Sequence, residues 1–264
     1  MKLSRAINSV PGSTIQYLVI VGLVVYAALQ GAQTMGYNWQ WYRVPQYFLR
    51  VTEDGLVWGE ILVGLSGTIV LSLTSFALAV ALGLLVAILR LSGLVVGQAV
   101  AVTLLEIVRN TPLLVLLYVF YYVLGPIFAL DRYVASVLCL AVFHAALISE
   151  IFRAGINSVS RGQWEAAQSI GMSKAQAYRY IILPQAVRIM LPPMTGEVVH
   201  LVKSSAIVSV IAVVELTTMG RNIISDTYMS FEIWFTIAGV YLVIILAVSV
   251  FASHLEKRFA VSSH

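Results

Sequence analysis

Six apolar runs, each long enough to cross a lipid bilayer, constrain the fold of this chain more than any other feature. A helix rises ~1.5 Å per residue and the hydrocarbon core is ~30 Å thick, so about 20 apolar residues make one crossing. Charged residues make up only 11% of the 264 residues, too few to cover a soluble globule of this size. We predict an all-α polytopic membrane protein with six spans, at about 14–30, 61–89, 98–124, 133–149, 197–216 and 233–253.

The basic residues predict the orientation of these spans. With six spans, ten Lys and Arg residues fall on the side of the N-terminus, four on the opposite side and two within spans. Cytoplasmic segments of membrane proteins are enriched in Lys and Arg, so both termini are predicted to be cytoplasmic. The formal net charge of +4 is dispersed between apolar runs, which favours positive-inside bias over nucleic-acid binding.

Two features limit other functions. The single Cys139 lies in an apolar run, so an intrachain disulfide, a Cys-rich metal site and a redox pair are all excluded. The first apolar run is long for a signal peptide, and no clear small-residue cleavage site follows it.

The aromatic-rich segment 34–60 is expected on the external face, with a short interfacial helix. A platform for an aromatic ligand is the alternative for this segment.

The third span carries unusual polar residues. Pro112 disfavours helical geometry at Thr111, so a break is expected there. Arg109 is predicted well inside the membrane, where an ionisable group must pair or face a polar cavity. Broken helices hold substrates in transporters, which makes Arg109 and Thr111 candidates for a substrate path. The structural alternative is a pair between Glu106 and Arg109 on one helix face.

The fifth span is interrupted by further polar residues. His200, Lys203 and Ser204 lie within it and Glu215 near its end, and all four are candidates to line or gate the same path. No second His or carboxylate has zinc-site spacing from His200, so a hydrogen-bonding or pore-facing His is favoured over a metal ligand. We predict no metal site and no catalytic residue.

Between the fourth and fifth spans, segment 158–190 is polar and rich in helix signals. Ser160 with Gln163, and Ser173 with Gln176, have capping-box spacing, so two short helices should begin there. Gly171 is a suitable stop for the first helix, and Pro184 should end or kink the second. The segment predicts a helix–turn–helix with a small apolar face that has no obvious partner nearby.

This hairpin resembles a known motif. Glu165-Ala166-Ala167, Gly171 and Ile182-Leu183-Pro184 resemble the EAA motif of the membrane subunits of binding-protein-dependent ABC importers. Gln185-Ala186 and Leu191-Pro192-Pro193 resemble the polar amino acid branch of that family. The alternative is an ordinary amphipathic surface hairpin.

The resemblance extends over most of the chain, from about Gly64 to the C-terminus. The stretch 109–115 resembles the family's Arg-x-Thr-Pro-Leu-Leu-Val, although Leu116 stands where many relatives have Gln. The run around Lys203 resembles the family's Lys-x-Ser, with Gly196 replacing a common Asn and Ala206 a common Leu. The resemblance implies a five-helix permease core at 61–264, with the coupling loop at about 158–190. An N-terminal helix and an external segment at 1–60 precede this core.

The resemblance also implies the function. A permease subunit of this kind translocates polar L-amino acids, here with acidic or amide side chains favoured by Arg109 and Lys203. Its partners would be two ATP-binding subunits, which hold ATP and Mg, a second permease subunit, and a periplasmic or extracellular binding protein. Glu165, Ala166, Ala167, Gly171 and Pro184 would couple it to the ATPase, in a bacterial cell membrane. The chain itself has no phosphate-binding Gly-x-x-x-x-Gly-Lys-Ser/Thr loop.

Three alternatives remain open. Importers of basic amino acids, cystine or opines share the same family pattern. An ion-coupled secondary transporter would act alone, but two evident repeats with paired broken helices are missing. An intramembrane enzyme would need a nucleophile and a base, and the sequence offers no such pair.

Overall fold

The computed structural model describes residues 10–53 and 55–259, and the chain divides into two units, Met1–Trp41 and Tyr42–His264. The first unit contains helix α2, Val10–Thr34. Its apolar stretch Thr14–Thr34 is long enough for one bilayer crossing, as predicted. The predicted domain boundary between residues 60 and 61 differs from this division. It follows from the resemblance to the permease family, so it stays a prediction.

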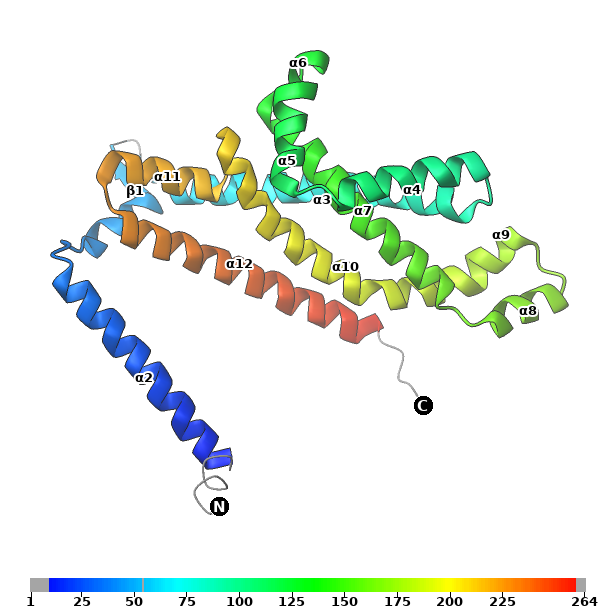
Figure 1. The fold of residues 1–264 in the computed structure, drawn as a ribbon, viewed down its shortest axis with the longest axis horizontal. Coiled ribbons are helices and arrows are strands. Elements are labelled where there is room, and N and C mark those ends of the chain that lie inside the picture. Colours follow the sequence, from blue (N-terminus) through cyan, green and yellow to red (C-terminus); the bar gives the residue numbers. More distant parts are fainter. Residues whose placement is uncertain (1–9, 54, 260–264) are drawn as a thin grey trace. The chain divides into compact units, whose positions relative to one another are not determined.

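The second unit is almost entirely helical (Figure 1). A 3₁₀ helix η1 (Trp41–Tyr47) and strands β1 (Leu49–Thr52) and β2 (Gly55–Trp58) lead into it. The elements that follow are α3 (Glu60–Leu91), α4 (Val95–Arg109), α5 (Leu113–Tyr118), the π-helix η2 (Val119–Leu124), α6 (Gly125–Phe128), α7 (Arg132–Asn157), α8 (Arg161–Ser169), α9 (Lys174–Ala177), the π-helix η3 (Tyr178–Ile182), α10 (Leu183–Ser205), the 3₁₀ helix η4 (Ala206–Ile211), α11 (Leu216–Thr227) and α12 (Ser230–Phe259).

The helices of suitable length agree with the prediction. The described residues hold five helices long and apolar enough to span a membrane, or six if the bent pair α4 and α5–α6 forms one span. This pair is bent by 106° at the predicted break around Thr111 and Pro112. Pro112 has φ −56° and ψ 136°, an extended conformation that stops α4 and starts α5. The break is therefore confirmed, but the third span is not the continuous run 98–124.

Small residues let the long helices approach closely. A Cβ added at Gly64 would come within 2.9 Å of the Leu216 Cα atom, and one at Gly83 within 2.8 Å of the Ile148 Cγ2 atom. These glycines place α3 directly against α11 and α7. Membrane helices pack through small residues because hydrophobic burial does not drive their association in lipid.

The fifth span differs from the prediction of 197–216. Helix α10 already begins at Leu183 and continues through Pro192 and Pro193. The hydroxyl of Thr195 donates to the Pro192 carbonyl oxygen at 2.7 Å, one way of satisfying polar groups near prolines in an apolar helix. Beyond Ser205 the chain tightens into η4 and turns at Ala212, which has φ 55°. Leu216 therefore belongs to α11, a separate helix.

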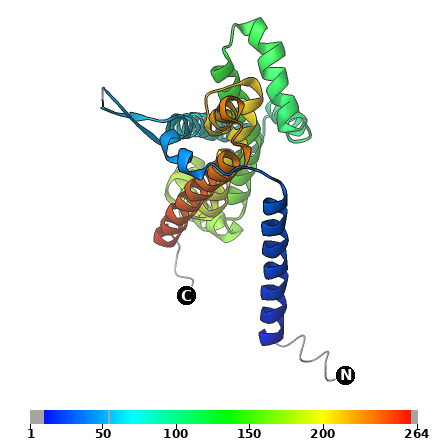
Figure 2. The same ribbon diagram turned by 90° about the vertical axis from the view of Figure 1, so that its left-hand side faces the viewer.

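The hairpin β1–β2 was not predicted. The two strands pair antiparallel from Leu49 with Trp58 to Thr52 with Gly55, and Figure 2 shows them extending away from the helices. The sequence signal for this hairpin is Gly55, the first residue of β2, whose φ of +117° favours glycine. The hairpin lies at the opposite end of the helical unit from α8 and α9 (Figure 1). That placement is what the predicted topology requires of an external segment and a cytoplasmic loop.

Candidate functional site

The polar loop forms a compact helical hairpin of α8, α9 and η3 next to the end of α7. Ser173 begins α9 with the predicted capping box, because its hydroxyl accepts from the Gln176 amide while Gln176 accepts from the Ser173 amide. Ser160 stands at the start of α8 but makes no side-chain cap, so the first predicted capping box is wrong. The Gln163 amide oxygen instead accepts from the Gln185 side chain at 3.3 Å.

Gly171 makes the turn of this hairpin, as predicted. Its φ of +77° lies in the left-handed region, which costs a residue with a Cβ ~1–2 kcal/mol. The Met172 amide donates to the Ala167 carbonyl and the Gly171 amide to the Gln168 carbonyl, the two bonds of a Schellman motif. No atom lies within 4 Å of a Cβ placed at Gly171, so backbone strain alone would oppose a substitution.

The apolar face of the hairpin has a partner inside the chain. Ala167 is fully buried, and Trp164 packs edge to face on Tyr178 with ring centroids 4.9 Å apart. Such an aromatic pair contributes ~0.5–1.5 kcal/mol beyond its buried area. Glu165 and Ala166 are exposed on the outer side of α8. The hairpin thus uses Ala167 for its own packing and leaves Glu165 and Ala166 exposed.

Pro184 does not end the second helix, which continues from α9 through η3 into α10. It lies in the first turn of α10, directly after the π-helix η3, where the missing amide hydrogen costs least. Single π-turns inside helices often mark functional positions. The predicted end at Pro184 is therefore wrong, because the helix continues through a π-turn directly before the proline, and the alternative of a kink stays a prediction.

The Glu150 carboxylate lies close to three arginines, which come from three helices. Glu150 of α7 lies 2.5 Å from the Arg90 guanidinium of α3, 2.9 Å from Arg153 and 3.7 Å from Arg109 at the end of α4. The alternative pair of Arg109 with Glu106 is not formed, and the Asn110 amide binds Glu106 at 3.0 Å instead. Because three guanidinium groups surround one carboxylate, the cluster has a net positive charge.

The polar residues of α10 divide between two environments. His200 and Lys203, three residues apart on one helix face, are exposed, and Ser204 beside them is partly exposed. One turn before His200, the buried Glu197 of α10 lies 2.5 Å from the Nδ1 atom of the buried His144 of α7. The Nδ1 atom of His200 lies 3.5 Å from the other Glu197 oxygen. Sequence analysis missed His144 and Glu197, because their 53-residue separation gives no local signal.

Glu215 is fully buried, and its oxygens are occupied by hydrogen bonds. It caps α11 by accepting from the Thr217 and Thr218 amides at 2.8 and 2.5 Å, and it accepts from the Tyr241 hydroxyl at 2.9 Å. Thr111 donates its hydroxyl to the Ile107 carbonyl at 2.7 Å. The structure therefore does not bring Glu215, Arg109 and His200 into one cluster.

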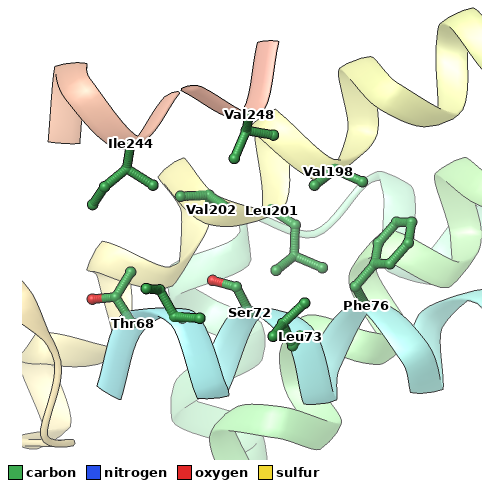
Figure 3. Close-up of a pocket in the computed structure, with 10 residues that line it drawn as sticks. Thr68, Ser72, Leu73, Phe76, Val198, Leu201, Val202, Ile244 and Val248 are labelled. Atoms are coloured by element: carbon green, nitrogen blue, oxygen red, sulfur yellow. The ribbon is translucent and has the colours of Figure 1, made fainter. Parts of the chain in front are cut away.

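A pocket of about 120 Å³ lies between α3, α10 and α12 (Figure 3). Its walls are apolar apart from the hydroxyl groups of Thr68 and Ser72, and side chains such as Phe76, Leu201 and Ile244 enclose it. A free amino acid carries an ammonium and a carboxylate that would lack partners in such a wall. The pocket does not suit a polar solute.

Comparison with known proteins identifies the family of this chain. Residues 79–261 match the model of the binding-protein-dependent transport system inner membrane component family. The chain belongs to this family. The permease is thus a multi-pass inner-membrane protein and a non-catalytic subunit, which works with a separate ATPase and a substrate-binding protein.

Individual relatives cover most of the permease. It is 37% identical to the probable glutamine ABC transporter permease protein GlnM of Bacillus subtilis over 74% of this chain and 91% of that protein. It is 30% identical to the glutamate/aspartate import permease protein GltJ of Escherichia coli over 85% of this chain and 96% of that protein. A crystal structure of an amino acid ABC transporter with histidines matches with a TM-score of 0.71 and 38% identity, covering 75% of this chain and 94% of that chain.

Proposed function

We propose that this permease imports polar L-amino acids, with acidic or amide side chains favoured. The observation that carries the proposal is the likeness to GlnM and GltJ over most of their lengths, since those relatives are named for glutamine and for glutamate and aspartate. Importers of basic amino acids, cystine or opines remain the alternatives within the family. The exposed Lys203 of α10 supports the acidic and amide class, because a cation next to the path attracts a carboxylate or an amide oxygen.

The proposed path follows the exposed polar face of α10, formed by His200, Lys203 and Ser204. Arg109 and Thr111, at the break between α4 and α5, are its further candidates. Glu215 stays a prediction as a gating residue, and the hydrogen bonds that it makes support a structural role. Polar side chains in membrane spans are costly, which favours a functional or paired state for each of them.

The proposed assembly contains two ATP-binding subunits, which hold ATP and Mg, and a second permease that is identical or homologous. Glu165, Ala166, Ala167, Gly171 and Pro184 belong to the proposed coupling hairpin. The exposed Glu165 and Ala166 on α8 support contact with the ATPase, because the small Ala166 permits close approach of another chain.

We expect Lys203→Ala to lower uptake of acidic amino acids by about 10- to 100-fold, because a hydrogen bond to a charged group contributes ~1.5–3 kcal/mol. Arg109→Ala should have a smaller effect, since Arg109 already lies near Glu150. The measurement is substrate-stimulated ATP hydrolysis and uptake in liposomes that contain this permease, its ATPase and candidate binding proteins.

The matched control is Arg188→Ala, at the other end of the same helix and also exposed. It should leave the substrate preference unchanged. Unchanged uptake and preference in both Lys203→Ala and Arg109→Ala would show that these residues are structural. Stimulation by no polar amino acid would refute the proposed substrate class.

Both termini are proposed to be cytoplasmic, with the β1–β2 hairpin outside and α9 inside. A cysteine in place of the exposed Val51 should react with a membrane-impermeant thiol reagent in intact cells, and one in place of the exposed Ala175 should react only after permeabilisation. The native Cys139 is buried, so background labelling of this thiol should be low. If the thiol at position 175 reacts in intact cells and the thiol at position 51 does not, the orientation in the membrane is opposite to the proposed one.

A further inference from the structure

Three side chains with metal-binding atoms meet between α7 and α10. The ligand atoms of His144, Glu197 and His200 all lie within 4.8 Å of one another. His144 comes from α7, while Glu197 and His200 are three residues apart on α10 and share one face of that helix. This cluster is built across two packed helices and does not lie on a flexible loop.

The cluster is held in place by its surroundings. His144 is fully buried and Glu197 is 8% exposed, whereas the side chain of His200 is 50% exposed. The Phe143 ring lies edge to face against both imidazoles, with centroids 5.3 Å from His144 and 6.5 Å from His200. One side of the cluster is thus closed by protein, and the side of His200 is open to entry.

A nitrogen atom of this cluster lacks a partner. The Nε2 atom of His144 is buried and has no hydrogen-bond partner among the described residues. A buried polar atom without a partner costs about 1–3 kcal/mol, and such a cost is unusual without a compensating ligand. Because the Nδ1 atom of the same ring already contacts Glu197, Nε2 is the ring nitrogen left to bind a further group.

The donor set and its spacing suit one kind of ligand. Two imidazoles and one carboxylate are the protein ligands of a common type of zinc site that keeps a fourth position open. Bonds of ~2.1 Å in a tetrahedron place ligand atoms ~3.4 Å apart. The Nδ1 atom of His200 and the Oε2 atom of Glu197, 3.5 Å apart, already have this spacing. The ligand atoms of all three residues lie within 4.8 Å of one another, so a modest approach brings them to it.

We propose that His144, Glu197 and His200 bind a divalent transition-metal ion of the Zn²⁺ type, which joins α7 to α10. Hard cations such as Mg²⁺ and Ca²⁺ are disfavoured, because they select oxygen ligands. The site shares His200 with the proposed path, but it does not depend on which solute the permease carries.

The test measures metal binding in the purified, detergent-solubilised permease after chelator treatment. The protein is purified without a polyhistidine tag, which would bind the same ions. Titration with Zn²⁺ should show one ion per chain, and X-ray absorption should show nitrogen and oxygen ligands at ~2.0–2.2 Å. Thermal denaturation should shift upward in the presence of Zn²⁺, because an ion that binds only the folded state stabilises it.

His200→Ala and His144→Ala should each weaken Zn²⁺ binding by more than ~100-fold, since even changes behind the ligands cost about 10- to 100-fold. The control His254→Ala removes an exposed histidine at the end of α12 and should bind normally. His200→Ala keeps the test decisive if His144→Ala fails to fold, because the His200 side chain is half exposed. Equal affinity of the wild type and His200→Ala, or no binding to the wild type, would overturn the proposal. Neither result would bear on amino acid uptake.

Discussion

Replacing Ala166 by Trp is expected to abolish uptake while leaving the permease inserted in the membrane. Ala166 is exposed on the outer face of α8, so the indole ring would project toward the proposed ATPase without disturbing the hairpin. Overfilling a close contact costs ~1–3 kcal/mol, which corresponds to about a 10- to 100-fold loss of association. Pull-down of the ATPase and uptake in the same membranes measure the two effects together.

The structure changes which alanine tests this coupling. Ala167→Trp would force an indole into the fully buried interior of the hairpin and unfold it, so lost uptake in that variant would not report on docking. The control for Ala166→Trp is Ala247→Trp, the same change at an exposed position of α12, which should retain ATPase binding. Normal association and normal uptake in Ala166→Trp would refute the coupling role of α8.

The turn of the hairpin offers a second variant of the same test. Gly171→Ala should weaken coupling through strain of ~1–2 kcal/mol at its positive φ. Gly162→Ala in α8 is the matched change, since no atom lies within 4 Å of the added Cβ and no positive φ is required. A difference between these two variants isolates the backbone conformation of the turn from the loss of glycine itself.

Gly67→Ala is expected to lower the thermal stability of the permease more than any other glycine-to-alanine change in the long helices. The added Cβ would collide with the Val214 carbonyl oxygen and lie 3.1 Å from its carbon, and backbone atoms cannot rotate away. Forced overpacking costs ~1–3 kcal/mol, which lowers Tm by roughly 2–12 °C in a chain of this size. Thermal unfolding of the detergent-solubilised protein, followed by loss of helical signal, measures it.

Gly239→Ala provides the control for this prediction. Gly239 also lies within a long helix, α12, but no atom approaches its added Cβ within 4 Å. Replacing glycine by alanine inside an open helix stabilises it by about 0.5–1 kcal/mol, so this variant should melt at the same temperature or slightly higher. A Tm of Gly67→Ala equal to that of Gly239→Ala would contradict the close contact between α3 and the segment before α11.

Features that depend on a few consecutive residues could be predicted from the amino-acid sequence. Apolar runs predicted the helices of transmembrane length, and Pro112 predicted the break after α4. Gly171 and the capping box at Ser173 predicted the turn and the second helix of the hairpin. These signals are local, because a missing amide hydrogen, a missing Cβ or a side chain three residues away acts on its own stretch of backbone.

Which polar residues contact one another depends on how the helices pack. Glu150, Glu197 and Glu215 each have at least one partner on another helix. Periodicity cannot distinguish the helix faces of a chain that is apolar on nearly all sides, so these pairs could not be predicted. Ala167 likewise became a buried residue only when η3 packed against α8. The rotation and approach of each helix depend on glycines and side chains far apart in the sequence, and therefore on packing that no local pattern contains.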